Sequence, residues 1–207
     1  MKNNCPLRYH YLVLFICLLG YGLPLLGQAS EGGPDVLLEF NQRQQRQQRT
    51  AMLVLGGWAV GNIATGALRR GAVTGEDRYF HEMNMYWNGV NLAIAAFGYY
   101  SAVKMDPAAM TLFESNQGFQ SFGKTLLFNA GLDLGYIAGG FYLQERANRP
   151  DVNGDRLRGF GKSIVVQGGF LLAFDLANYY MLSRTGKEFL PVLLGPTQDG
   201  IGMTLVF

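Results

Sequence analysis

Four apolar segments constrain the fold of this chain more than any other feature. They cover residues 51–68, 85–103, 125–143 and 163–182. A transmembrane helix needs about 20 mostly apolar residues, and only Asp133 and Asp175 put a formal charge inside these segments. Charged residues make up 15% of the chain, against roughly 25% in soluble domains. The sequence therefore predicts an all-α protein, a four-helix transmembrane bundle within residues 30–188.

The chain begins with the composition of a secretory signal peptide, over residues 1–29. Basic residues precede an apolar run at residues 11–19, and a stretch with small residues ends at Ala29. We expect cleavage after Ala29, with an uncleaved membrane anchor as the alternative. Both cysteines, Cys5 and Cys17, lie in this segment. The cleaved chain would therefore lack disulfides, cysteine nucleophiles and cysteine-ligated metals.

Residues 36–50 are rich in Gln and Arg and contain neither Gly nor Pro. This composition predicts a solvated helix that runs into the first apolar segment, with a nucleic-acid-binding arm as the alternative. The net charge of the whole chain is only +2. A charge this small argues against a nucleic-acid partner, so we expect the lipid bilayer to be the principal partner.

The charges of the connectors predict an orientation. Arginine and lysine gather at residues 69–84 and 144–162, whereas the connector at 104–124 has lysines only at its edges. Cytoplasmic loops carry the excess of basic residues in membrane proteins. We therefore expect a protein of the bacterial inner membrane with its mature N-terminus outside. A separate surface helix is expected over residues 107–118, because Asp106-Pro107 is a helix-start signal.

A polar stripe runs from the first connector into the second apolar segment. At about 100° per residue, His81, Asn84, Asn88 and Asn91 fall within one arc of about 80°. The other apolar segments also have one polar face each, and the fourth includes Gln167. Amides and carboxylates that face lipid are costly, so these faces should converge. The resulting polar seam comprises Asn62, Glu76, Arg78, His81, Asn84, Asn88, Asn91, Asp133 and Asp175. It would either hold the helices together or receive a small polar ligand, ion or proton.

Small residues recur every four positions on three of the apolar segments. Such rows allow close approach between helices in lipid, within one chain or between the chains of a homo-oligomer. The predicted packing rows are Gly57 and Gly61; Gly131, Gly135 and Gly139; and Gly169, Ala173 and Ala177. The third and fourth segments also look like copies of one another, since Phe122-Gly-Lys124 is matched by Phe160-Gly-Lys162. Consecutive spans run in opposite directions, and inverted repeats of this kind occur in transporters.

Catalytic and metal-binding motifs are absent from the sequence. It has no P-loop, dinucleotide fingerprint, Gly-x-Ser-x-Gly elbow or His-Glu-x-x-His zinc motif. After signal cleavage His81 would be the only histidine, so we predict no metal site, and nothing specifies a cofactor. An enzyme would have to use the cytoplasmic-side cluster of Glu76, Arg78 and His81. We therefore expect a non-enzymatic protein.

The C-terminal residues 189–207 predict a short β-hairpin. Alternating apolar residues from Ile201 to Phe207 follow the turn-forming residues 195–199. An alternating strand that ends in Phe also occurs in outer-membrane barrels, which gives the outer membrane as a minor alternative. The helical spacing of the small residues opposes that alternative, because barrel strands alternate with period two.

Several runs of residues resemble a known family. Gly56-Gly57-Trp58-Ala59, Arg78-Tyr79-Phe80-His81, Asp133-Leu-Gly-Tyr136 and Arg156-Leu-Arg-Gly-Phe-Gly161 are similar to a family of uncharacterised bacterial membrane proteins, mainly from Bacteroidota. The resemblance covers most of residues 50–182. Because that family is a domain of unknown function, the resemblance implies the architecture and transfers no activity.

The sequence thus predicts an uncharacterised integral membrane protein, a binding or structural helical bundle with a polar interior. The first alternative is an oligomeric transporter or channel component for a small polar solute, ion or proton. The second is a membrane enzyme built on Glu76, Arg78 and His81.

Overall fold

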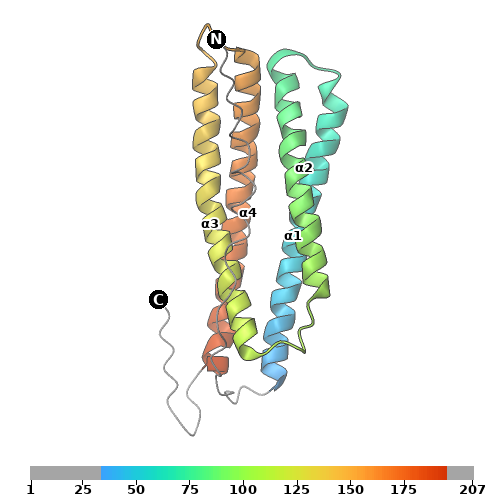
Figure 1. Ribbon diagram of the computed structural model, residues 1–207, viewed down its shortest axis with the longest axis vertical. Coiled ribbons are helices and arrows are strands. Elements are labelled where there is room, and N and C mark those ends of the chain that lie inside the picture. Colours follow the sequence, from blue (N-terminus) through green and yellow to red (C-terminus); the bar gives the residue numbers. More distant parts are fainter. Residues whose placement is uncertain (1–33, 195–207) are drawn as a thin grey trace, which may run out of the picture.

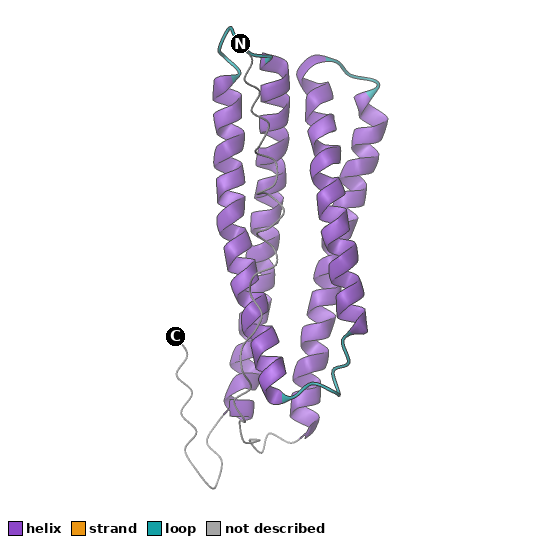
Figure 2. Cartoon of the chain, viewed as in Figure 1, coloured by secondary structure: helices purple, strands orange, loops and turns teal. Residues whose placement is uncertain are grey.

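The computed structural model describes residues 34–194, which form four helices and contain no strand. The helices are α1 (Pro34–Arg70), α2 (Gly75–Lys104), α3 (Leu112–Arg146) and α4 (Gly154–Leu194). They lie side by side in a long bundle (Figures 1 and 2). The prediction of an all-α, four-helix bundle is therefore confirmed for the described part of the chain.

Two predictions concern the ends of the chain. The predicted signal peptide, residues 1–29, lies outside the described residues. The predicted hairpin lies partly outside them, but its first strand is wrong, since residues 189–194 belong to α4. The physical reason is that the Phe189 ring is buried against the Phe40 ring of α1, which favours continuing the helix over leaving it.

The bundle consists of two antiparallel helix pairs. Helix α1 packs most extensively on α2, and α3 on α4, while α4 also contacts both α1 and α2. The α1–α2 and α3–α4 connections lie at one end of the bundle, and the α2–α3 connection lies toward the other (Figure 1). α4 is thus the helix that joins the two pairs.

Two of the helices are long enough and apolar enough in composition to cross a membrane. The stretches are Asp35–Arg70 of α1 and Gly154–Pro191 of α4. With 37 residues in α1 and 41 in α4, these helices are about 55–60 Å long at 1.5 Å per residue. A bilayer core is only about 30 Å thick, so each helix is long enough to extend well beyond one.

Helix α3 begins with a capping box. The Thr111 Oγ1 atom accepts a hydrogen bond from the Glu114 backbone N–H, and Glu114 Oε2 accepts one from the Thr111 backbone N–H. The bond from the Thr111 backbone lowers the pKa of Glu114. The separate surface helix expected over residues 107–118 is therefore wrong, because the cap starts one continuous helix at Leu112.

Side chains of α1 tie down the α2–α3 connection. Gln45 Nε2 donates to the carbonyl oxygens of Ala102 and Met105 at 2.9 and 2.8 Å, which satisfies carbonyls left free at the end of α2. Asn41 Nδ2 donates to the carbonyl oxygen of Pro107 at 3.0 Å. Part of the Gln-rich stretch of α1 therefore faces the protein, although its sequence predicted a solvated helix.

An apolar cluster fills one end of the bundle. It comprises Phe40 of α1, Phe119 and Leu126 of α3, and Leu182 and Phe189 of α4. The Phe40 ring lies 5.7 Å from the rings of both Phe119 and Phe189. Charged residues such as Glu39, Arg46 and Lys187 are exposed at this end. The interior of this end also holds buried polar side chains, among them Asn41, Gln44, Ser115 and Thr185.

In the rest of the bundle, polar side chains are buried and large apolar side chains are exposed. Its buried polar side chains include Asn84, Asn88, Asn91, Asp133, Gln167 and Asp175. Its exposed apolar side chains include Leu53, Val60, Val90, Ile94, Phe97, Phe128, Leu134, Phe141, Val166 and Leu176. Large apolar side chains thus face outward along this part of the bundle, around an interior that combines amides and carboxylates with small apolar residues such as Ala59 and Ala95.

Candidate functional site

Asn84 is the centre of a buried amide network. Its Oδ1 atom accepts hydrogen bonds from Ser163 Oγ at 2.9 Å and from Gln167 Nε2 at 2.7 Å. Its Nδ2 atom donates to Asn62 Oδ1 at 3.1 Å. These contacts connect α2 to α1 on one side and to α4 on the other. Asn84, Ser163 and Gln167 are all buried.

Trp58 closes the network on α1. Its indole N–H donates to Gln167 Oε1 at 2.8 Å, and its ring stacks on Phe170 with centroids 3.9 Å apart and planes 4° apart. Asn62 Nδ2 donates to the Trp58 carbonyl oxygen at 2.9 Å, one helical turn away. Both polar atoms of the Gln167 side chain therefore have partners.

Asn88 and Asn91 extend the network along α2. Asn88 Nδ2 donates to the Asn84 carbonyl oxygen at 2.8 Å, and Asn91 Nδ2 lies 3.5 Å from Asn88 Oδ1. Both residues are buried. We call Trp58, Asn62, Asn84, Asn88, Asn91, Ser163 and Gln167 the amide network. Its members bond largely to each other, so a ligand is not needed to satisfy them.

Asp133 of α3 and Asp175 of α4 form a separate acid pair. Only 2% of Asp133 and 5% of Asp175 is exposed. Their carboxyl groups lie close enough to hydrogen-bond to each other, which requires a proton on one of them. Among residues 34–194, no hydrogen bond joins either acid to the amide network, and Asp133 Oδ2 is buried without a partner. The predicted polar seam is therefore two groups of residues.

The connector residues of the seam do not form one cluster. Glu76 pairs with Lys162 of α4, Arg78 is exposed, and His81 is half-buried. Glu76 and His81 are five residues apart, or about 140° around α2. His81 Nδ1 is buried with no hydrogen-bond partner among the described residues. In the same part of the chain, no group of three or more His, Cys, Asp or Glu residues is placed to hold a metal ion.

The glycines of the predicted packing rows do not meet another helix among residues 34–194. All eight residues are exposed, and a methyl group added at Gly57, Gly61, Gly131, Gly135, Gly139 or Gly169 would meet nothing within 4 Å. The close contact instead lies between Gly140 and Gly161, where a Cβ on Gly140 would lie 2.7 Å from the Gly161 carbonyl oxygen. The role of the rows between chains stays a prediction.

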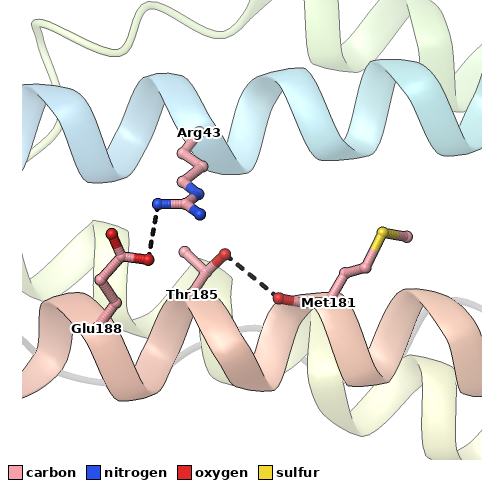
Figure 3. Close-up of polar contacts among 4 residues, drawn as sticks. All are labelled: Arg43, Met181, Thr185 and Glu188. Atoms are coloured by element: carbon pink, nitrogen blue, oxygen red, sulfur yellow. Dashed lines mark hydrogen bonds and ion pairs between the residues drawn. The ribbon is translucent and has the colours of Figure 1, made fainter.

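A groove between α1 and α4 was missed by the sequence reasoning. Its volume is about 1150 Å³. Basic side chains line it near the apolar cluster, and Arg43 pairs there with Glu188 at 2.8 Å across the two helices (Figure 3). Thr185 lies on α4 between Glu188 and Met181 and donates to the Met181 carbonyl oxygen at 3.3 Å (Figure 3). Val54 and Phe174 line the groove further along.

The spacing of arginines in α1 was the signal for this groove. Arg43 and Arg46 are three residues apart and therefore share a helix face. They also lie shortly before the first apolar segment. The Gln and Arg repeat favoured a uniformly solvated helix, so it did not indicate that this face lines a groove.

Comparisons with known proteins give a family and no activity. A family model described as a family of unknown function, DUF6992, matches residues 54–176. No curated protein and no solved structure matches the chain. The matched residues contain the whole amide network and the acid pair, whereas Arg43, Arg46 and Lys187 lie outside them.

Proposed function

The chain belongs to the DUF6992 family of unknown function, and from this premise we propose that it is a non-enzymatic, membrane-embedded helical bundle whose amide network holds the helices together. Its four spans would be residues 51–68, 85–103, 125–143 and 163–182. The observation that carries the proposal is that large apolar side chains are exposed along residues 51–182 while amides and carboxylates are buried between the helices.

Exposed apolar side chains support the membrane location. Phe97 is 74% exposed, Phe128 65% and Val90 62%. These large residues lie on α2 and α3, whereas the two helices long and apolar enough to cross a membrane by length and composition are α1 and α4. A continuous apolar exterior of this kind is rare on soluble monomers. Hydrocarbon would cover it at no cost, while the amides inside avoid lipid.

The bonding of the amide network supports a structural role. Hydrogen bonds between transmembrane helices contribute about 0.6 kcal/mol on average and up to about 1.7 kcal/mol. Asn84 alone makes three such bonds to two other helices. We therefore assign Asn62, Asn84, Asn88 and Asn91 to helix association.

The proposed location is the bacterial inner membrane, with the N-terminus of α1 outside and the α1–α2 and α3–α4 connections in the cytoplasm. The support is the excess of arginine and lysine in those two connections. The signal peptide predicted for residues 1–29 would give the same orientation.

Single cysteines test both the membrane location and the orientation. In a Cys5→Ser, Cys17→Ser background, Ala72→Cys and Ala108→Cys place exposed thiols at opposite ends of the bundle. In intact spheroplasts a membrane-impermeant maleimide should label the cysteine at position 108 and spare the one at position 72. Permeabilisation should expose both. Equal labelling in intact spheroplasts, or recovery of the protein without membranes, would refute the proposal.

A second candidate function is an oligomeric transporter or channel component for a proton or small polar solute. The acid pair favours it, because two intramembrane carboxyl groups that face each other can hold a proton. The exposed row of Gly131, Gly135 and Gly139 supplies a surface for oligomerisation. The enzyme alternative is weaker, since Glu76 is held by Lys162 and points away from His81.

A further inference from the structure

We propose that the α1–α4 groove binds an anionic phospholipid, with the phosphate at its basic end and an acyl chain on its apolar wall. This inference rests on the proposed membrane location. It assigns a ligand to a groove whose lining includes no member of the amide network or the acid pair.

The charge of the groove favours an anion. Arg43, Arg46, Arg184 and Lys187 line it, and the lining residues include one carboxylate, Glu188. Glu188 pairs with Arg43 at 2.8 Å. Among residues 34–194, no carboxylate pairs with the other three cations, which are exposed. Guanidinium groups bind phosphate through paired N–H donors, so this cluster suits a phosphate headgroup.

The opposite part of the groove is apolar. Val54 of α1 and Phe170, Ala173, Phe174 and Ala177 of α4 line it. The Trp58 ring stacks on Phe170 and continues this wall toward the amide network. A free phosphate ion would use only the basic end. An occupant that uses both ends must be amphiphilic.

The position of the groove along the bundle matches that of a lipid. Arg43 precedes the proposed span of α1 and Lys187 follows that of α4, whereas Val54 and Phe174 lie inside these spans. Arg46 and Val54 are eight residues apart, or about 12 Å along α1. The groove thus crosses the proposed water–membrane boundary with its charges on the water side. The polar headgroups of the outer leaflet would lie at this boundary, beside the basic end of the groove.

The size of the groove also fits a lipid. Pockets for small molecules measure about 300–1000 Å³, and this groove measures about 1150 Å³. It is therefore larger than an isolated anion requires.

Lipid binding by the full chain in detergent tests the inference. Native mass spectrometry would compare phosphatidylglycerol with phosphatidylcholine of the same acyl chains. The parent protein should prefer phosphatidylglycerol, and the triple variant Arg46→Gln, Arg184→Gln, Lys187→Gln should lose about tenfold or more in affinity for it. The matched control Arg69→Gln, Arg146→Gln, Arg149→Gln removes three exposed charges at the other end of the bundle and should bind like the parent. Equal affinity for both lipids, or equal losses in both variants, would overturn the inference.

A second variant separates a lipid from a free phosphate. Ala173→Trp with Ala177→Trp fills the apolar part of the groove from exposed positions, so the bundle should still fold. It should reduce phosphatidylglycerol binding, whereas inorganic phosphate should fail to compete with the lipid in the parent protein. Undiminished lipid binding by this variant, or competition by phosphate at millimolar concentration, would instead identify an anion site. A protein that labels as membrane-embedded but does not prefer phosphatidylglycerol would refute only this inference and leave the proposed function standing.

Discussion

Gln167 Nε2 donates a hydrogen bond to Asn84 Oδ1 at 2.7 Å inside the bundle, although the two residues are 83 positions apart in the sequence. Asn84 also accepts a hydrogen bond from the Ser163 hydroxyl, and Gln167 also accepts one from the Trp58 indole N–H. One amide pair therefore links three helices. Its energetic contribution can be measured directly.

Replacing Asn84 with Leu should lower the free energy of unfolding by about 2 kcal/mol, since it removes three interhelical hydrogen bonds at about 0.6–1.7 kcal/mol each. Thermal unfolding in detergent, followed by circular dichroism, measures the change. Thr65→Ala is the control, because the exposed Thr65 bonds only to the Gly61 carbonyl of its own helix. A network that binds a ligand without supporting the fold would leave both variants equally stable.

Asn84 and Gln167 should also be energetically coupled. The double variant Asn84→Ala, Gln167→Ala should be more stable than the sum of the single changes implies, by about 1 kcal/mol. The reason is that each single change already breaks their shared bond. Additive effects within about 0.3 kcal/mol would mean that the two amides act independently.

The indole N–H of Trp58 should contribute separately from its ring. Trp58→Phe keeps an aromatic ring for stacking on Phe170 and loses the bond to Gln167, so it should cost about 1 kcal/mol. Trp58→Ala removes both contacts and should cost about 3–5 kcal/mol. Unfolding of both variants in the same detergent distinguishes these contributions. Equal losses would show that the ring contributes nothing beyond the indole bond, and a Trp58→Phe variant as stable as the parent would show that Gln167 gains nothing from the indole.

Two glycines of α3 should respond differently to a methyl group. Gly140→Ala places a Cβ about 2.7 Å from the Gly161 carbonyl oxygen, which forces α3 and α4 apart and should cost about 1–3 kcal/mol. Gly135→Ala meets open space and should be neutral or stabilising by up to about 1 kcal/mol through helix propensity. The same unfolding measurement compares them. The reverse order would place Gly135 at the buried interface.

The sequence was sufficient to predict where the helices lie along the chain. It was insufficient to predict how each helix is rotated about its own axis in the bundle. The apolar segments are long enough to be helices in any arrangement, and the spacing of Asn84, Asn88 and Asn91 puts them on one face, which the structure buries. The face that meets a partner depends on every neighbouring helix. The row through Gly135 therefore looked like a packing surface, while the contact at Gly140 gave no periodic signal.

Prediction of the groove and of the acid pair from the sequence was limited for the same reason. Arg43 and Lys187 are 144 positions apart, and only the packing of α1 beside α4 makes them one charged cluster. Asp133 and Asp175 were each recognisable as acids inside apolar segments. Asp133 lies on α3 and Asp175 on α4, so the packing of these two helices brings the acids together, and no local pattern encodes that packing.

The acid pair distinguishes the two candidate functions. Asp133→Asn with Asp175→Asn keeps hydrogen-bonding groups of similar size and removes both titratable carboxyls. If the bundle conducts protons or a polar solute, proteoliposomes with the parent protein should show flux that this variant loses, while its thermal unfolding stays within about 1 kcal/mol of the parent. If the pair only joins α3 to α4, neither protein should show flux above empty vesicles. Flux that persists in the double variant would exclude the acid pair from the pathway. Asn62→Ala is the matched control, because it perturbs the amide network and leaves both acids in place.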